Sequence, residues 1–151
     1  MPASQSYTLH PAGLRDLPGL RRLEHECFPD DAWPLVDLLA SLSFPGLVRI
    51  KAVAGEQMIG FVGGDTDHSA KRGWITTLGV TAAWRRHGVA RALLAACEAA
   101  LPLPCIRLCV RRSNQAAQTL YLSSGYHQVE TWPRYYQGGE DALVLEKVRP
   151  D

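Results

Sequence analysis

Hydrophobic residues in the first part of the chain recur at helical spacing. Residues 6–10 are expected to form a short strand, and Asp16 is placed to cap a helix that ends at Phe28 and Pro29. Its apolar stripe consists of Leu17, Leu20, Leu23 and Cys27. A second short helix is expected after Trp33, stopped by residues 43–46, with an inward face of Leu35, Leu38, Leu39 and Leu42.

The middle of the chain has the pattern of strands. Residues 47–54 and 57–64, separated by a turn at Gly55 and Glu56, predict a β-hairpin. Residues 73–80 predict a third strand, and proximity along the chain favours antiparallel pairing of the three.

The second half continues with two helices and three strands. A broad apolar helical face ends at Pro102 and consists of Val89, Ala90, Leu93, Leu94, Cys97 and Leu101. A strand at 104–111 follows, and Asn114 and Gly125 are suitable caps for a helix over 115–124. Strands are expected near 126–131 and 142–148. The pattern predicts one α+β domain over residues 1–151 with a strand, helix, strand crossover in its second half.

Composition restricts the classes of function. The 151 residues are 46% hydrophobic and 21% charged, which is typical of one globular domain. A net charge of +1 gives no global basic field, so nucleic acid is not expected as the main partner. No apolar run approaches the ~20 residues of a membrane span, and the amino terminus lacks the pattern of a signal peptide. We therefore expect a cytoplasmic protein without a membrane partner.

Cysteine and histidine spacing gives no metal signature. Cys27, Cys97, Cys105 and Cys109 form no CxxC pair and lie in apolar segments, so we expect buried free thiols. The five histidines are scattered along the chain, and no metal site is expected.

The start of the helix near residue 88 carries charges of the unfavourable sign. Arg85, Arg86, His87 and Gly88 lie where the helix dipole is already positive. Free backbone N–H groups beside a glycine form an anion site, and a bound pyrophosphate would reverse that penalty. The alternative is a solvated loop with Gly88 serving a tight turn, because a lone glycine-rich loop is a weak signal.

The segment LGVTAAWRRHGVARALL, residues 78–94, resembles motif A of the GCN5-related N-acetyltransferases (GNAT). In that motif, R/Q-x-x-G-x-G/A binds the pyrophosphate of acetyl-CoA, and Arg85, Gly88 and Ala90 fill the three positions here. The resemblance implies a GNAT fold: a mixed, mostly antiparallel sheet of six to seven strands, about four helices and a central splayed strand pair. It also implies that acetyl-CoA is bound by Leu78, Gly79, Val80, Arg85, Arg86, His87, Gly88, Val89, Ala90, Arg91, Asn114 and Tyr121.

Two further segments extend the resemblance over almost the whole chain. LCVRRSNQAAQTLYLSSGY, residues 108–126, resembles motif B, which implies that Asn114 contacts the coenzyme and that Tyr121 is the general acid. YYQGGEDALVLEK, residues 135–147, resembles the tail of protein amino-terminal acetyltransferases, particularly the ribosomal-protein-alanine type, and ECFPDDAW, residues 26–33, fits the same subgroup. The implied substrate residues are Phe28, Trp33, Tyr135 and Tyr136. Taken without the family, Tyr121 is a core tyrosine and the other tyrosines belong to a packed hairpin.

Acetyl transfer needs a neutral amine, a donor for the carbonyl oxygen and a proton for the leaving thiolate. The resemblance assigns the second task to the N–H of Val80, and Gly79 is also compatible with a β-bulge. It leaves the base open, because Cys109 occupies the position where bacterial relatives usually carry a glutamate. Cys109 qualifies as a base only if Arg107 and Arg111 face it and lower its pKa, and plain core packing is the alternative. Base catalysis through a water molecule by Glu26, His68 or His127 also stays open.

The sequence thus predicts an acetyl-CoA-dependent N-acetyltransferase that uses direct attack by a primary amine, the α-amino group of a protein or peptide being favoured. The alternatives are a small-molecule amine acetyltransferase, acting on a polyamine, amino acid or aminoglycoside, and a non-catalytic CoA-binding module. Either a monomer or a homodimer is compatible with the sequence.

Overall fold

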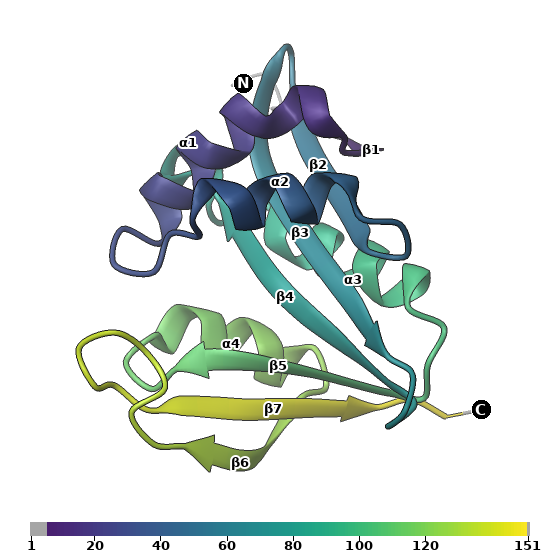
Figure 1. Ribbon diagram of the computed structural model, residues 1–151, viewed down its shortest axis with the longest axis vertical. Helices are drawn as coiled ribbons and strands as arrows, with labels where there is room; N and C mark the ends of the chain where they lie inside the picture. Colours follow the sequence, from purple (N-terminus) through teal and green to yellow (C-terminus); the bar gives the residue numbers. More distant parts are fainter. Residues whose placement is uncertain (1–5, 151) are drawn as a thin grey trace.

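The computed structural model describes residues 6–150 and folds them around one seven-stranded sheet (Figure 1). Residues 1–5 and 151 lie outside the described residues. The expected domain over residues 1–151 therefore extends past the described residues at both ends, and the expectation for the extreme amino terminus lies outside them. Between these limits the elements are, in chain order, β1 (Thr8–Pro11), η1 (Leu14–Asp16), α1 (Leu17–Cys27), α2 (Leu35–Ser43), β2 (Val48–Ala54), β3 (Gln57–Asp67), β4 (Arg72–Val80), η2 (Ala82–Trp84), α3 (Val89–Ala100), β5 (Cys105–Arg111), α4 (Gln115–Ser123), β6 (His127–Trp132) and β7 (Ala142–Val148).

The sheet has the strand order β1-β2-β3-β4-β5-β7-β6. Strands β4 and β5 are parallel and are joined by α3, whereas the other neighbouring strands pair antiparallel. This confirms the predicted hairpin, the predicted crossover and the expected mixed, mostly antiparallel sheet of six to seven strands. No helix in the described part of the chain is long and apolar enough to cross a membrane.

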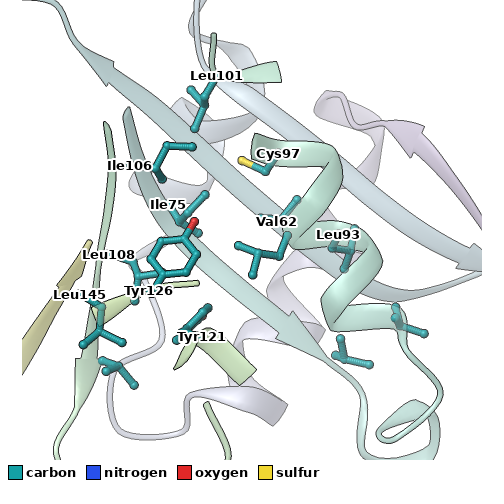
Figure 2. Packing of buried hydrophobic residues seen from close by; sticks show 14 of the residues in the cluster. Val62, Ile75, Leu93, Cys97, Leu101, Ile106, Leu108, Tyr121, Tyr126 and Leu145 are labelled. Atoms are coloured by element: carbon teal, nitrogen blue, oxygen red, sulfur yellow. The ribbon is translucent and has the colours of Figure 1, made fainter. Parts of the chain in front are cut away.

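Two hydrophobic cores lie on the two faces of the sheet. The smaller core joins α1 and α2 to the sheet through residues such as Leu20, Leu38 and Phe61. The larger core joins α3 and α4 to the other face, with Val62, Ile75, Leu93, Cys97, Leu108 and Tyr121 among its members (Figure 2). Helices α1 and α4 therefore reach the centre of the sheet from opposite sides.

The parallel strands β4 and β5 separate after three residue pairs. They pair only from Arg72 to Trp74 on β4, and β5 then continues alongside β7 alone. The β3–β4 register shifts between Gly63 and Gly64, which leaves Thr76 as the extra residue on β4, two positions beyond Trp74, and such a bulge bends a strand. The bulge thus explains the splay, which is visible as the divergence of β4 and β5 in Figure 1.

The bulge is not at Gly79, where one was considered possible. Gly79 keeps regular register with Phe61, and its role is close packing instead. A Cβ at position 79 would lie 3.1 Å from Cys27 Sγ and 3.4 Å from the Phe28 ring. The absence of a side chain on Gly79 therefore lets the end of α1 lie directly on β4.

Two expectations for the first helices were wrong in detail. Asp16 precedes α1, but its carboxylate bonds the amide of Gly13 and Lys51 Nζ instead of the helix's own amides. On α2, Leu38 and Leu42 are buried, whereas Leu35 and Leu39 are 44% and 38% exposed. Helix α2 covers the edge of the smaller core, so a narrower stripe than predicted faces inward.

Candidate active site

The amino end of α3 opens onto a cavity of about 730 Å³, here called the α3 cavity. Gly88 is the N-cap of α3 with φ 79°, in the left-handed region that favours glycine, and no side chain caps the helix. The first intrahelical bond runs from the Ala92 amide to the Gly88 carbonyl, so the three preceding N–H groups have no acceptor within the helix. Backbone N–H groups presented in this way bind anions.

The lining of the α3 cavity carries positive charge. Arg85, Arg86 and Arg91 contribute to it, and no acidic side chain does so among the described residues. The Arg91 guanidinium is also held at the end of α4 by the hydroxyl groups of Ser123 and Ser124. The combination of free amides and three guanidinium groups suits a pyrophosphate.

The fold brings together nearly all the residues predicted to bind the coenzyme. The α3 cavity is lined by Leu78, Gly79, Val80, Arg85, Arg86, Gly88, Val89, Ala90, Arg91, Asn114 and Tyr121. His87 is the exception: its ring packs against Trp84 with the centroids 5.6 Å apart, and it is not among the lining residues. Cys27, Trp84 and Leu120 also line the cavity and were not predicted, because ordinary apolar residues carry no signal of their own.

The end of β4 directs one amide into the splay. The Thr81 amide donates to the Ile59 carbonyl on β3. Because amide directions alternate along a strand, the N–H of Val80 points away from β3, toward the side where β5 has separated. Cys27 Sγ and Arg85 Nε donate to the Val80 carbonyl at 3.4 and 3.3 Å, which holds the end of β4 in place. The geometry provides a hydrogen-bond donor for a carbonyl oxygen at the splay.

Tyr121 enters the same region from α4. It is 7% exposed, its ring lies 5.9 Å from that of Tyr126, and burial raises the pKa of its hydroxyl well above the ordinary value. The hydroxyl is therefore protonated at neutral pH and available as a donor. Asn114 is the N-cap of α4, and its side chain accepts a hydrogen bond from the Ala117 amide.

A second cleft of about 800 Å³, here called the aromatic groove, lies on the other face of β5. Leu108 and Val110 point into the larger core, so the alternating residue Cys109 points to the groove. Its walls include Trp33, Trp74, Trp132, Tyr135 and Tyr136. Successive rings from Trp74 to Tyr136 lie 4.9–6.0 Å apart, which gives a continuous aromatic wall.

Arg111 ties the two loops of the groove together. Its guanidinium binds Asp31 through two hydrogen bonds of 2.6 and 2.7 Å and Glu140 through one of 2.9 Å. It also lies 4.6 Å above the centre of the Tyr136 ring. Glu140 in turn accepts from the Ser113 amide, so this acidic residue shapes the loop before β7.

A small cavity of about 150 Å³, here called the passage, lies at the splay between the α3 cavity and the aromatic groove. It shares lining residues with both: Phe28, Leu78 and Tyr121 with the cavity, and Trp33 and Tyr136 with the groove. The two larger clefts have the size of ligand sites, whereas the passage admits only a small group. Of the predicted substrate residues, Tyr135 alone lies outside the passage, on the groove wall at 55% exposure.

Cys109 does not meet the condition for a base. The Arg107 guanidinium is paired with Glu146 and Glu130, and Arg111 is paired as described. Burial, together with the charge of Glu130, raises the pKa of the Cys109 thiol to about 11. A thiol with that pKa is protonated at neutral pH and cannot accept a proton from an amine.

The three other predicted candidates for the base lie away from the passage. Glu26 is exposed and accepts a hydrogen bond from the Ala82 amide at 2.9 Å. His68 and His127 are exposed on a turn and an edge strand. None of the three lines the α3 cavity, the groove or the passage.

Glu24 was missed by the sequence analysis and lines the passage. It is 3% exposed, and its Oε1 accepts a hydrogen bond of 3.0 Å from the Thr77 hydroxyl. A signal for it was present: position 24 follows Leu20 by four residues and precedes Cys27 by three, so the helical period places a carboxylate on the buried face of α1.

Comparison with known proteins gives consistent results. A model of the acetyltransferase (GNAT) family matches residues 17–126. The N-terminal acetyltransferase A complex catalytic subunit NAA10 of Arabidopsis thaliana is 30% identical over 143 residues, which cover 90% of this chain and 74% of that protein. The N-alpha-acetyltransferase RimI of Mycobacterium tuberculosis is 30% identical over 127 residues, covering 81% and 79%.

The fold is also similar to that of a solved N-acetyltransferase structure. The ribosomal-protein-S18-alanine N-acetyltransferase from Escherichia coli superposes with a TM-score of 0.85 over 97% of this chain and 96% of that one, at 22% sequence identity. At this identity the likeness concerns the fold.

Proposed function

The chain belongs to the acetyltransferase (GNAT) family and is an acetyl-CoA-dependent N-acetyltransferase, and we propose that its acceptor is the α-amino group of a protein or peptide. We also propose that residues 1–151 form a single acetyltransferase domain, an assignment supported by the one sheet that runs through the described residues.

The observation that carries the proposed acceptor is the aromatic groove with its narrow exit. The groove of about 800 Å³ suits several residues of a peptide, whereas the passage of about 150 Å³ suits a terminal amine. Tyr136 and Trp33 stand at the junction of the two, where an amino terminus would turn inward. Similarity to an N-terminal acetyltransferase catalytic subunit and to an N-alpha-acetyltransferase supports the same acceptor.

In the proposed mechanism acetyl-CoA binds the α3 cavity with its pyrophosphate on the amides and arginines at the start of α3. The Val80 N–H then donates to the thioester oxygen as negative charge develops on it. The amine enters through the passage and attacks the thioester carbon directly. Tyr121, protonated because burial raises its pKa, supplies the proton for the leaving sulfur.

The test uses two peptides of matched sequence, one with a free amino terminus and no free lysine, the other with a blocked terminus and one lysine. At about pH 7.4 the fraction of neutral amine is roughly two orders of magnitude larger for an α-amino group, pKa 7.7–8.0, than for lysine, pKa 10.4. We expect at least that preference in kcat/KM, with the rate rising as the pH approaches the amine's pKa. Faster transfer to lysine, or to free polyamines and aminoglycosides measured in parallel, would overturn the proposed acceptor.

A further inference from the structure

Glu24 has a buried carboxylate oxygen that the fold leaves unsatisfied. Its Oε1 accepts from Thr77, but Oε2 has no hydrogen-bond partner among the described residues. The Trp33 amide also acts on the carboxylate, yet no contact with Oε2 reaches hydrogen-bond geometry. An unsatisfied buried acceptor costs stability, and native proteins contain few of them. Packing alone therefore does not explain a glutamate at this position.

The location of Glu24 matches the geometry that acetyl transfer needs. It lines the passage together with Tyr121, Thr77 and Leu78, which places it where the α3 cavity and the aromatic groove meet. Helix α1 brings Glu24 from one face of the sheet, and α4 brings Tyr121 from the other. A substrate in the passage therefore lies between a carboxylate and a phenol that reach it from opposite sides.

Within residues 6–150, no unpaired cation lines the passage beside the Glu24 carboxylate. The other charged groups of the passage are Asp31 and Arg111, which bind each other, and Arg111 is also bound to Glu140. The other titratable neighbours are Tyr121, Tyr136 and Cys27, and burial raises the pKa of each, so all three are neutral at pH 7.

The same surroundings favour proton acceptance by Glu24. Burial raises the pKa of the Glu24 carboxyl, opposed by hydrogen bonding from Thr77 and the Trp33 amide. A carboxylate whose pKa moves toward the working pH is a stronger base.

We propose that Glu24 is the general base of this acetyltransferase, the role that the family resemblance left open because Cys109 occupies the expected position. The amine nitrogen forms a bond to the thioester carbon, one N–H proton passes to the Glu24 carboxylate, the carbon–sulfur bond breaks, and the sulfur takes the proton of the Tyr121 hydroxyl. Glu24 then returns its proton to solvent while Tyr121 regains one. The assignment rests on an amine acceptor, as in the proposed function, and holds for any amine that reaches the passage.

The first experiment compares Glu24→Gln with Glu26→Gln, two changes on the same helix. Glu24→Gln is expected to lower kcat by roughly 10²- to 10⁴-fold, the loss typical of a missing general base, while acetyl-CoA affinity by calorimetry stays within about three-fold. Glu26→Gln, an exposed position outside the passage, is expected to keep kcat. Near-normal kcat in a folded Glu24→Gln variant, or a loss in Glu26→Gln instead, would overturn the proposal.

A second variant tests the assignment without removing the carboxylate. Thr77→Val keeps the side-chain shape but deletes the hydrogen bond that lowers the pKa of Glu24, so that pKa is expected to rise further. The acidic limb of the pH profile of kcat is expected to move to higher pH, although the amine's own pKa is unchanged. The ¹³C carboxyl resonance that disappears in Glu24→Gln is expected to titrate at the same pH as the limb in each protein. If the titration of the Glu24 resonance shifts in Thr77→Val but the acidic limb of kcat stays at the same pH, Glu24 is not the base whose protonation sets that limb.

The outcomes separate this inference from the proposed acceptor. Measurements are made with the best amine found in the peptide and small-amine comparison. If a small amine is preferred, the proposed acceptor fails, yet the Glu24 and Thr77 effects are still expected on that amine. If the α-amino peptide is preferred but Glu24→Gln is fully active on it, the base assignment alone fails.

Discussion

At the scale of single residues, Gly88 combines a left-handed backbone conformation with a position at the proposed pyrophosphate site. Its φ of 79° is unfavourable for other residues, and a Cβ at this position would meet no atom within 4 Å, because it would point into open space at the α3 cavity. The glycine is therefore required by its backbone conformation and not by packing against the protein. The same open space would let the proposed pyrophosphate approach the amides at the start of α3.

Gly88→Glu is expected to abolish measurable acetyl-CoA binding, because the side chain brings bulk and negative charge to the proposed pyrophosphate site. Loss of two charge-assisted hydrogen bonds at about 1.5–3 kcal/mol each corresponds to a loss of affinity of at least about 100-fold. The matched control is Gly46→Glu, since Gly46 has φ 86°, room for a Cβ with no atom within 4 Å, and no place in the α3 cavity. Both variants carry a backbone strain of roughly 1–2 kcal/mol. Calorimetric titration with acetyl-CoA distinguishes them, and equal affinities would contradict the anion site.

At the scale of elements, the sequence predicted what local patterns encode. The start of α3 and the Asn114 cap of α4 are contiguous signals, and both lie as expected. The Glu24–Thr77 contact joins residues 53 apart, and no local pattern pairs α1 with β4. Leu35 and Leu39 were placed inward because helical period marks a face but not how much of it a small core can cover. The splay likewise depends on the β-bulge opposite Gly63 and Gly64. Two adjacent glycines are compatible with a bulge, but they do not predict one.

Also at this scale, Arg111 joins three elements of the aromatic groove, and its replacement by lysine is expected to weaken acceptor binding. Lysine keeps the charge but loses the two-point contact with Asp31 and the stacking on Tyr136. We expect KM for the peptide to rise about five- to ten-fold, consistent with about 1 kcal/mol, and acetyl-CoA affinity to stay unchanged. Arg112→Lys is the control, because that neighbouring side chain is 60% exposed and pairs with Asp141 at 3.4 Å. An equal rise of KM in both variants would contradict a specific role for Arg111.

At the scale of the whole molecule, the two clefts open on opposite faces of β5, and the passage lies between them. Leu108 and Val110 face the core below Tyr121, whereas Cys109 faces the aromatic groove. With acetyl-CoA and the acceptor bound as proposed, one substrate does not need to leave before the other binds. A covalent route would need a thiolate, but burial raises the pKa of both nearby thiols, Cys27 and Cys109. This arrangement favours direct transfer within a ternary complex.

Initial-rate measurements in which both substrates are varied are therefore expected to give intersecting double-reciprocal lines. Parallel lines are the signature of a ping-pong reaction through an acetyl-enzyme, which the two protonated thiols disfavour. Incubation with acetyl-CoA alone is expected to leave the intact mass of the protein unchanged, and Cys109→Ala is expected to keep the intersecting pattern with little change in kcat. Desulfo-CoA, which lacks the reacting thiol, is expected to compete with acetyl-CoA and not with the peptide, because the two clefts bind their ligands separately. Parallel lines together with an acetylated cysteine would contradict direct transfer and move the chemistry from the passage to a thiol.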